Sequence, residues 1–443
     1  MFKKIIIYLL SGVLILSLTA CGEKSKYEKA ERLKDEQKYD EAIALFTELG
    51  DYQDAEGLKY SCYDSYLSLL CFNGEYSKAL EIGEEYKKNC DVDILDVEDY
   101  VRIYEGVNKI LNSDEDSGWA LLKKQAPTNG KSTSDVWRDV LEPAIGGDDK
   151  DKQLKAYRIV KYISGVTNDD YNLRICDDRD STLKYRALDI GETFTFGKYY
   201  QDYDKSKAVE EYGKTFYITS SFSTNCLKQP VEWVVLDRDG SKILAITKDC
   251  IDCANCGGAY VYDRSKNKIP ISEYLPTTVF NAVCSDKAVL WEDSAVRAYL
   301  NSLVRSSLFM EHEWKYIAET TIDSCKTKDS IFLLSYAEVE KYKNVPNFYA
   351  SKTEYATLLN KEHLKYAMTD SDVDKVKNEK TWWALRKTAN DPSGRWRAVG
   401  CSEDEVYWVT DGYKFLEEQY KGYPDTHSRQ YIRPAVWFDF SVE

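Results

Sequence analysis

The motifs that commonly identify enzymes are scarce in this chain of 443 residues. It has three histidines, His312, His363 and His427, and no pair has the spacing of a zinc-protease helix. The Gly-x-Ser-x-Gly turn of serine hydrolases and the Gly-x-x-x-x-Gly-Lys phosphate loop are both absent. Carboxylates are plentiful, but their spacing singles out no glycosidase pair. We therefore expect neither an enzyme nor a bound cofactor.

Positive charge is also in short supply. The chain has 60 Lys and Arg against 75 Asp and Glu, a formal net charge of −15. This balance argues against nucleic acid and against electrostatic adhesion to anionic lipid, because both are negatively charged. Calcium or a basic polymer remains open as a partner. Beyond the first residues, the sequence also lacks an apolar run long enough to span a bilayer.

The first residues form the one long apolar run of the chain. Lys3 and Lys4 precede the segment IIIYLLSGVLILSLTA, which ends at Cys21. This pattern predicts a signal peptide at residues 1–20. The letters LTAC resemble the lipobox of bacterial lipoproteins, which implies cleavage before Cys21 and lipid attachment to its sulfur. We expect residues 21–26 to be a lipid-anchored tether and the protein to be extracytoplasmic, bound to the bacterial cell membrane; an uncleaved membrane anchor is the alternative.

Composition and periodicity divide the remaining chain into two parts. In the first, EQKYDEAIALF and NGEYSKALEIG align Tyr39 with Tyr76 and Ala42 with Ala79, at a spacing of 37 residues. Each copy carries one apolar helix face, and a period in this range is typical of stacked helical hairpins. Residues 27–112 resemble tetratricopeptide repeats, with plain antiparallel helices as the alternative. Residues 113–190 are expected to be a helical or irregular connecting region.

The second part, residues 191–443, holds eight of the ten tryptophans and changes to a period of two. VEWVVLD, the turn signal Asp239-Gly240 and KILAIT predict a β-hairpin. Further strands are expected from Ile331, Glu405 and Ile432, and WEDSAVRAYLNSLV is expected to be a helix. The predicted fold class is multidomain: an all-α helical-repeat region followed by an α+β, mainly antiparallel C-terminal domain.

Six segments of residues 191–443 together resemble a family of bacterial extracytoplasmic domains of unknown function. They are GETFTFGKYYQ, PVEWVVLDRDG, LWEDSAVRAYLNSLV, DSIFLLSYAEVEKY, WWALRK and IRPAVWFDF. The last two also resemble the C-type-lectin-like fold shared with formylglycine-generating enzymes. This chain departs from the family pattern at Lys387, where Ser is usual, and in the charged segment that follows.

The segment TWWALRK supplies the candidate ligand-binding residues. In a strand, Trp383 and Leu385 share one face, and Trp382 and Arg386 share the other. We expect the first pair to be core and the second to lie nearer a functional surface, as a cation–π pair or as ligand contacts. A purely structural role for both faces is the alternative. Arg395 and Trp396, in the charged segment, are further ligand-binding candidates.

Cysteines provide the weakest of the candidate sites. Cys250, Cys253 and Cys256 follow successive Cys-x-x-Cys spacings, but no second such pair exists. A disulfide or small buried side chains are the alternatives, so we expect no metal. The predicted function is a cell-surface binding module in which the helical repeats present a C-type-lectin-like ligand-binding domain, and the partner is a protein, peptide or glycan. An enzyme related to formylglycine-generating oxidases and a scaffold of an envelope complex are the alternatives.

Overall fold

The computed structural model describes residues 22–90, 96–112, 114–124, 130–211, 214–218, 226–255, 258–262, 268–270, 282–284, 291, 295–322, 328–361, 367–369, 381–386, 397–401, 406–411 and 429–442. The chain divides into two compact units, Met1–Ala187 and Leu188–Glu443. The expected signal peptide and Cys21 lie outside the described residues. Within the described ranges, no helix combines the length and the apolar character needed to cross a membrane.

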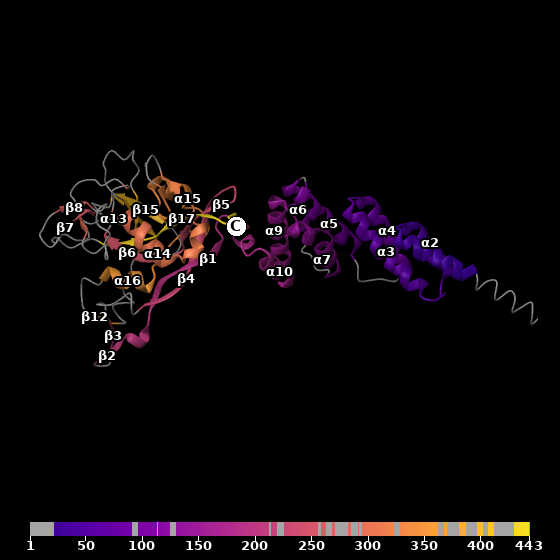
Figure 1. Ribbon diagram of the computed structural model, residues 1–443, viewed down its shortest axis with the longest axis horizontal. Helices are drawn as coiled ribbons and strands as arrows, with labels where there is room; N and C mark the ends of the chain where they lie inside the picture. The colour runs from indigo at the N-terminus through magenta and orange to yellow at the C-terminus, as the bar shows by residue number, and fades with distance from the viewer. Residues whose placement is uncertain are drawn as a thin grey trace, which may run out of the picture. The chain divides into compact units, whose positions relative to one another are not determined.

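The first unit is built from helices (Figure 1). A helix over residues 22–35 begins it, so residues 22–26, expected as a tether, are helical. The helices that follow are α2 (Tyr39–Leu49), α3 (Ala55–Phe72), α4 (Tyr76–Cys90), α5 (Val97–Asn112), α6 (Glu115–Lys124), α7 (Gly130–Val136), the π-helix η1 (Trp137–Leu141), α8 (Glu142–Gly146), α9 (Lys150–Thr167), α10 (Tyr171–Arg179) and α11 (Leu183–Arg186). The prediction of a helical N-terminal region is confirmed.

The repeated apolar faces pack as their spacing predicts. Ala42 and Phe46 are buried on α2, and Ala79 occupies the equivalent place on α4. Gly83 stands where the first copy has Phe46, 37 residues earlier. A Cβ on Gly83 would lie 2.2 Å from Cγ1 of Val97, so the close approach of α4 and α5 requires a glycine at this position. The two copies therefore share a helical pattern but differ in how closely the next helix approaches.

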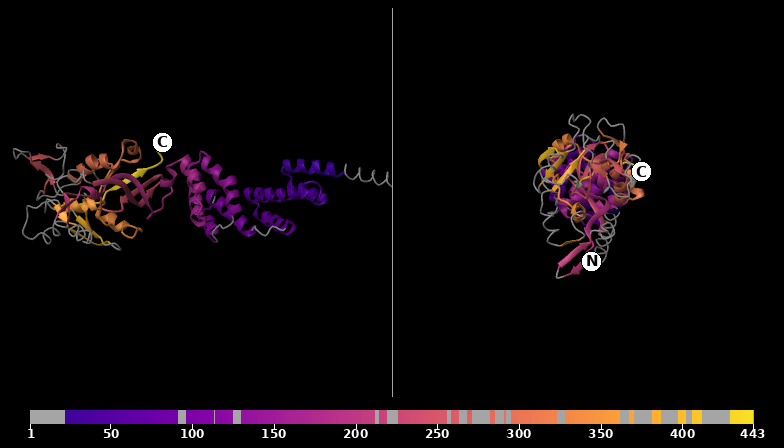
Figure 2. Two further views of the ribbon diagram at one scale, coloured as in Figure 1. Left: turned by 90° about the horizontal axis from the view of Figure 1, so that it is seen from below. Right: turned by 90° about the vertical axis from the view of Figure 1, so that its left-hand side faces the viewer.

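The second unit contains a four-stranded antiparallel sheet in the order β1-β4-β5-β17. Its strands are β1 (Thr193–Tyr203), β4 (Cys226–Asp239), β5 (Lys242–Thr247) and β17 (Ala435–Asp439). The long strands β1 and β4 run side by side (Figure 2). Gly240 has φ +59° at the turn between β4 and β5, which confirms the predicted hairpin. The indole of Trp233 donates to the carbonyl of Phe196 at 2.8 Å and is fully buried.

A five-stranded sheet has the order β15-β14-β13-β16-β6, with β13 and β16 parallel and the other pairs antiparallel. Its strands are β6 (Asp252–Asn255), β13 (Thr381–Leu385), β14 (Arg397–Cys401), β15 (Val406–Asp411) and β16 (Arg429–Ile432). Three smaller sheets complete the strands that the structure describes. One joins β2 (Val209–Glu211), β3 (Lys214–Ile218) and β12 (Ala367–Thr369), and another joins β7 (Gly258–Tyr262), β8 (Lys268–Pro270) and β9 (Ala282–Cys284). The last pairs β10 (Thr320–Thr321) with β11 (Lys328–Asp329).

The second unit also contains short helical segments. They are η2 (Lys205–Lys207), α13 (Ala295–Tyr299), the π-helix η7 (Leu300–Val304), α14 (Arg305–Leu308), η8 (Glu311–Tyr316), α15 (Tyr336–Tyr342) and α16 (Glu354–Lys361). The predicted α+β, mainly antiparallel class is confirmed.

Two expected strands differ from the prediction. The segment from Ile331 is buried, but it forms a single bridge, Phe332 to Ala435, instead of a strand. Other groups bind much of its remaining backbone: the Asn301 side chain binds the N–H and the carbonyl of Ile331, and Arg386 donates to the carbonyls of Leu333 and Leu334. The segment from Ile432 is divided, since β16 ends at this residue and β17 begins at Ala435 in the other sheet.

The predicted helix WEDSAVRAYLNSLV also contains a local irregularity. Its described part starts as α13, widens into the π-helix η7, and continues as α14. Val296 and Leu300 are buried as their spacing predicts, and Val304 is buried four residues after Leu300. The strand expected from Glu405 is present as β15.

Candidate functional site

A cavity of about 270 Å³ lies in the helical unit, between α7, η1, α9 and the residues that lead into α10. Its apolar lining comes from Trp137 and Leu141, at the two ends of the π-helix, and from Val160 and Ile163 on α9. Leu141 and Val160 are buried, while Trp137 and Ile163 are half-buried. A π-turn is a rare insertion that occurs often at functional sites. Here it forms one wall of the cavity.

Polar groups line the rest of the cavity, and several have no partner of their own. Among the described residues, the indole N–H of Trp137, the hydroxyl of Ser164 and the side-chain amide of Asn172 make no hydrogen bond. Ser164 is only 9% exposed, and Trp137 and Asn172 are half-buried, but none of their polar atoms is fully buried. The cavity therefore presents accessible polar atoms beside an apolar surface, which is the usual chemistry of a ligand site.

The remaining polar lining is already ordered by local hydrogen bonds. The Thr133 hydroxyl donates to the carbonyl of Gly130 at 3.0 Å, and the Thr167 hydroxyl donates to the carbonyl of Ile163 at 2.8 Å. Asp169 uses Oδ1 to accept from the N–H of Tyr171 at 3.0 Å, at the start of α10. These bonds fix the rim of the cavity before any ligand arrives.

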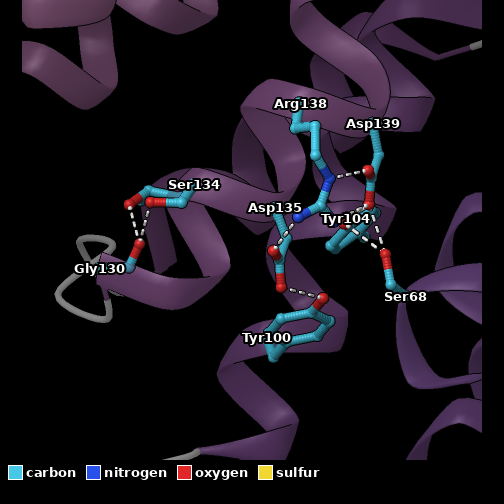
Figure 3. Close-up of polar contacts among 9 residues, drawn as sticks. Ser68, Tyr100, Tyr104, Gly130, Ser134, Asp135, Arg138 and Asp139 are labelled. Atoms are coloured by element: carbon cyan, nitrogen blue, oxygen red, sulfur yellow. Dashed lines mark hydrogen bonds and ion pairs between the residues drawn. The ribbon is translucent and has the colours of Figure 1, made fainter. Parts of the chain in front are cut away.

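The opposite side of α7 and η1 is held to α3 and α5 by a carboxylate cluster (Figure 3). Oδ2 of Asp139 accepts from the hydroxyls of Tyr104, at 2.7 Å, and of Ser68. Oδ2 of Asp135 accepts from Tyr100 at 2.9 Å. Arg138 pairs with both carboxylates, 3.0 Å from Oδ1 of Asp135 and 2.7 Å from Oδ1 of Asp139. We name these residues the helix lock, because they fix the cavity wall to α3 and α5.

Burial and hydrogen bonds shift the pKa values of the two tyrosines and of Asp139 in the helix lock. Burial raises the pKa values of Tyr100 and Tyr104 well above the ordinary tyrosine value, so both remain hydrogen-bond donors. Burial also acts to raise the pKa of Asp139, but hydrogen bonds from Arg138 and the two hydroxyls outweigh it. The pKa of Asp139 therefore lies below its ordinary value. The carboxylate is thus ionised at neutral pH.

The second unit contains the segment TWWALRK, and the burial of its residues tests the predicted core and surface roles. Trp383 and Leu385 are buried, at 0% and 3% exposure, which confirms them as core. The expectation that Arg386 lies on an open surface is wrong, because it is only 5% exposed. Its guanidinium donates to the carbonyl of Leu333 at 2.6 Å and pairs with Glu338. It also lies 5.5 Å from the ring centre of Phe332. The side chain of Trp382, and both Arg395 and Trp396, lie outside the described residues.

Two of the three cysteine candidates lie within the described residues. Cys250 and Cys253 are buried, at 0% and 2% exposure, whereas Cys256 lies outside the described residues. In the part of the chain that the structure describes, no group of His, Cys, Asp or Glu could hold a metal ion. Burial raises the pKa of the Cys226 thiol, on β4, to about 12.

The polar residues of the motif segments bind one another. Asp329 accepts from the indole of Trp291 at 2.7 Å and from the guanidinium of Arg297 at 2.6 Å. Arg433 is fully buried, donates to the carbonyl of Phe348 at 2.6 Å, and lies 4.8 Å from the ring centre of Trp383. These side chains connect segments that are far apart in the sequence. These motif residues therefore stabilise the fold of the unit.

A further buried cluster has the same character. Tyr199 and Tyr299 both donate to Oδ2 of Asp252 at 2.6 Å, and Oδ1 of Asp252 accepts from the N–H of Cys253 at 2.7 Å. Burial raises the pKa of both tyrosines well above the ordinary value. The cluster ties β1, β6 and α13 together.

Residues 275–440 match the model of DUF6273, a domain of unknown function. The matched segment contains Asp329, Arg386 and Arg433, whose contacts are described above. Two motif segments of the expected resemblance, GETFTFGKYYQ and PVEWVVLDRDG, lie before it. No curated protein and no solved structure matches the chain.

The cavity residues were missed by reasoning from sequence. The segment VWRDVLEP reads as an ordinary helix, and nothing in it predicts a π-turn at Trp137. Ser164 and Asn172 are polar residues of the connecting region, which resembled no family. A faint signal was present, since Trp137 is one of only two tryptophans before residue 191.

Proposed function

We propose that this protein is an extracytoplasmic, lipid-anchored binding protein whose ligand enters the cavity of the helical unit. The observation that carries the proposal is the group of unpartnered polar atoms on Trp137, Ser164 and Asn172 beside an apolar wall. The signal-like start and Cys21 support lipid anchoring.

In this proposal, the unit that contains the DUF6273 domain supports or presents the binding unit. Arg386, a predicted ligand contact, and Arg433, in the last motif segment, are both buried and bound within the unit. The resemblance to C-type-lectin-like domains stays part of the proposal, and it rests on the two motif segments WWALRK and IRPAVWFDF. Arg395 and Trp396 stay predicted ligand contacts of that unit.

The alternative of a formylglycine-generating type of oxidase has less support. That chemistry needs a thiolate, and the reactive form of a thiol is disfavoured when burial raises its pKa. Cys226 has such a raised pKa, and Cys250 and Cys253 are buried. A binding role uses the features of the cavity without requiring a reactive thiol.

A pocket-filling variant tests the proposal. Ser164→Leu places an apolar side chain into the cavity, while Val166→Leu enlarges an exposed residue of the same helix that does not line it. The full-length proteins, purified in detergent, are screened by thermal shift against amines, amino acids, short peptides and oligosaccharides. We expect compounds that raise the Tm of the wild type and of Val166→Leu, but leave Ser164→Leu unchanged. Equal shifts in all three proteins would place the binding site elsewhere.

A further inference from the structure

We propose that the cavity binds an alkylammonium group, carried by a small free amine or by a lysine side chain of a peptide. This inference rests on the proposed function, because it names the ligand class of the same cavity. The charge of the lining, the end of α9, the free ring of Trp137 and the size of the cavity lead to it independently.

The charge of the lining is negative. Asp169, an exposed residue at the rim, is the one carboxylate among the lining residues, and none of these residues is basic. Oδ1 of Asp169 already accepts from Tyr171, and Oδ2 remains for a ligand. A buried or half-buried anion would find no counter-charge here, whereas a cation would. The lining therefore selects against carboxylates and phosphates.

The C-terminus of α9 adds negative potential to the same place. Ser164 and Thr167 belong to its last turn, where the final carbonyls of a helix have no partner within the helix. The helix dipole favours cations at this end, yet the last turn contains no basic residue. The negative end of this 18-residue helix is thus uncompensated by its own side chains.

Trp137 and the residues around it complement both the charged head group and the hydrocarbon stem of an alkylammonium. The half-buried ring of Trp137 packs against the hydrophobic core, lines the cavity, and makes no aromatic or cation–π contact with another described residue; tryptophan is the best ring for binding a cation. An ammonium has three N–H donors, and Ser164, Asn172 and Asp169 each offer an oxygen. The apolar residues Leu141, Val160 and Ile163 suit the hydrocarbon stem.

Size and surrounding charge agree with this ligand. The volume of about 270 Å³ lies just below the usual range for drug-sized ligands, so it fits one side chain or a small amine. Residues 22–187 contain 36 Asp and Glu against 25 Lys and Arg, a net charge of −11. This field raises the local concentration of cations around the unit.

Isothermal titration of the full-length protein in detergent and amine-free phosphate buffer tests the inference. The probes are n-butylammonium and N-acetyl-lysine methylamide, with n-butanol and butyrate as neutral and anionic controls. We expect both ammonium probes to bind and both controls to fail. Tighter binding of the lysine probe would assign the ligand to a peptide, and tighter binding of n-butylammonium would assign it to a free amine.

Two neighbouring aspartates give a matched pair of variants. Asp169→Asn removes the charge but retains an oxygen that can cap Tyr171, and it should weaken the ammonium probes about tenfold. Asp170→Asn changes an exposed residue that pairs with Arg174 and does not line the cavity, so affinity should be unchanged. Equal losses in both variants would refute the inference, because a general field would then explain the binding.

The failure of this inference is distinct from the failure of the proposed function. Binding of butyrate or n-butanol that Ser164→Leu abolishes would overturn the ammonium assignment but keep the cavity as a ligand site. Ammonium binding that Ser164→Leu leaves intact would overturn both. Circular dichroism melts of each variant confirm that lost binding does not reflect lost folding.

Discussion

Replacing Asp139 with alanine should weaken the helix lock more than its partly exposed position suggests. Tyr104 is fully buried, and its hydroxyl donates to Asp139 at 2.7 Å; Ser68 donates to the same oxygen. A hydrogen bond to a charged group contributes about 1.5–3 kcal/mol net. Arg138 has a side chain that is 61% exposed, so its ion pair contributes at most about 1 kcal/mol.

These contributions do not simply add, because burial of the carboxylate opposes them. In the alanine variant, the Tyr104 hydroxyl keeps Ser68, at 3.2 Å, and Tyr100 as hydrogen-bond partners in the helix lock. We expect Asp139→Ala to lower the free energy of unfolding by about 2–4 kcal/mol. Tyr104→Phe should cost about 1–2 kcal/mol, and the double variant should show a coupling of about 1–2 kcal/mol.

Denaturant unfolding of the full-length protein, followed at 222 nm where helices dominate, measures these values. The pKa of Asp139 is lowered in the folded state, so its contribution is present above the ordinary aspartate pKa of about 3.9 and is lost as pH falls toward the folded value. The difference between wild type and Asp139→Asn should therefore shrink below about pH 4. A variant Asp139→Ala within about 0.5 kcal/mol of wild type would refute the lock.

Four further predictions concern the rest of the chain. Trp383→Ala should cost about 3–5 kcal/mol of unfolding free energy in a denaturant titration, as large aromatic deletions in cores do. Arg386→Ala should cost a similar amount, since it removes the charged partner of the Glu338 carboxylate and a donor to the buried carbonyl of Leu333; a cost below about 1 kcal/mol would contradict the buried assignment. Cys21→Ala should release the protein from membranes or leave an unprocessed precursor in fractionation and gel mobility. Cys226 should react with iodoacetamide only after denaturation, judged by mass spectrometry of the native and unfolded chain, because its thiol is buried with a pKa of about 12.

Local patterns in the sequence fix much of the fold. The spacing of Ala42, Phe46 and Ala79 predicts helices with one buried face, because residues three and four apart share a side of a helix. The alternation in VEWVVLD and the turn at Gly240 predict a hairpin, because glycine readily adopts the positive φ that the turn has. Each of these depends on residues that are neighbours along the chain.

Sequence patterns predict less well the features that depend on residues far away in the chain. IFLLS has the composition of a strand, yet Asn301 and Arg386 bind its backbone groups, and a single bridge remains. A buried apolar segment needs its N–H and carbonyl groups satisfied, but sequence does not say whether strands or side chains do so. The same limit applies to Arg386 itself. The alternation of a strand places Arg386 on the face opposite Trp383. Only the fold shows that this face meets the carboxylate of Glu338 and the carbonyl of Leu333.

The sequence by itself determined the helical first unit, the mainly antiparallel second unit, the hairpin at Gly240 and the core role of Trp383. Only the tertiary structure decided that Arg386 is buried and that Trp137 and Ser164 share a cavity. The physical reason is that periodicity records which face of an element is apolar, whereas burial of a charge and the shape of a cavity depend on contacts between elements far apart in the chain.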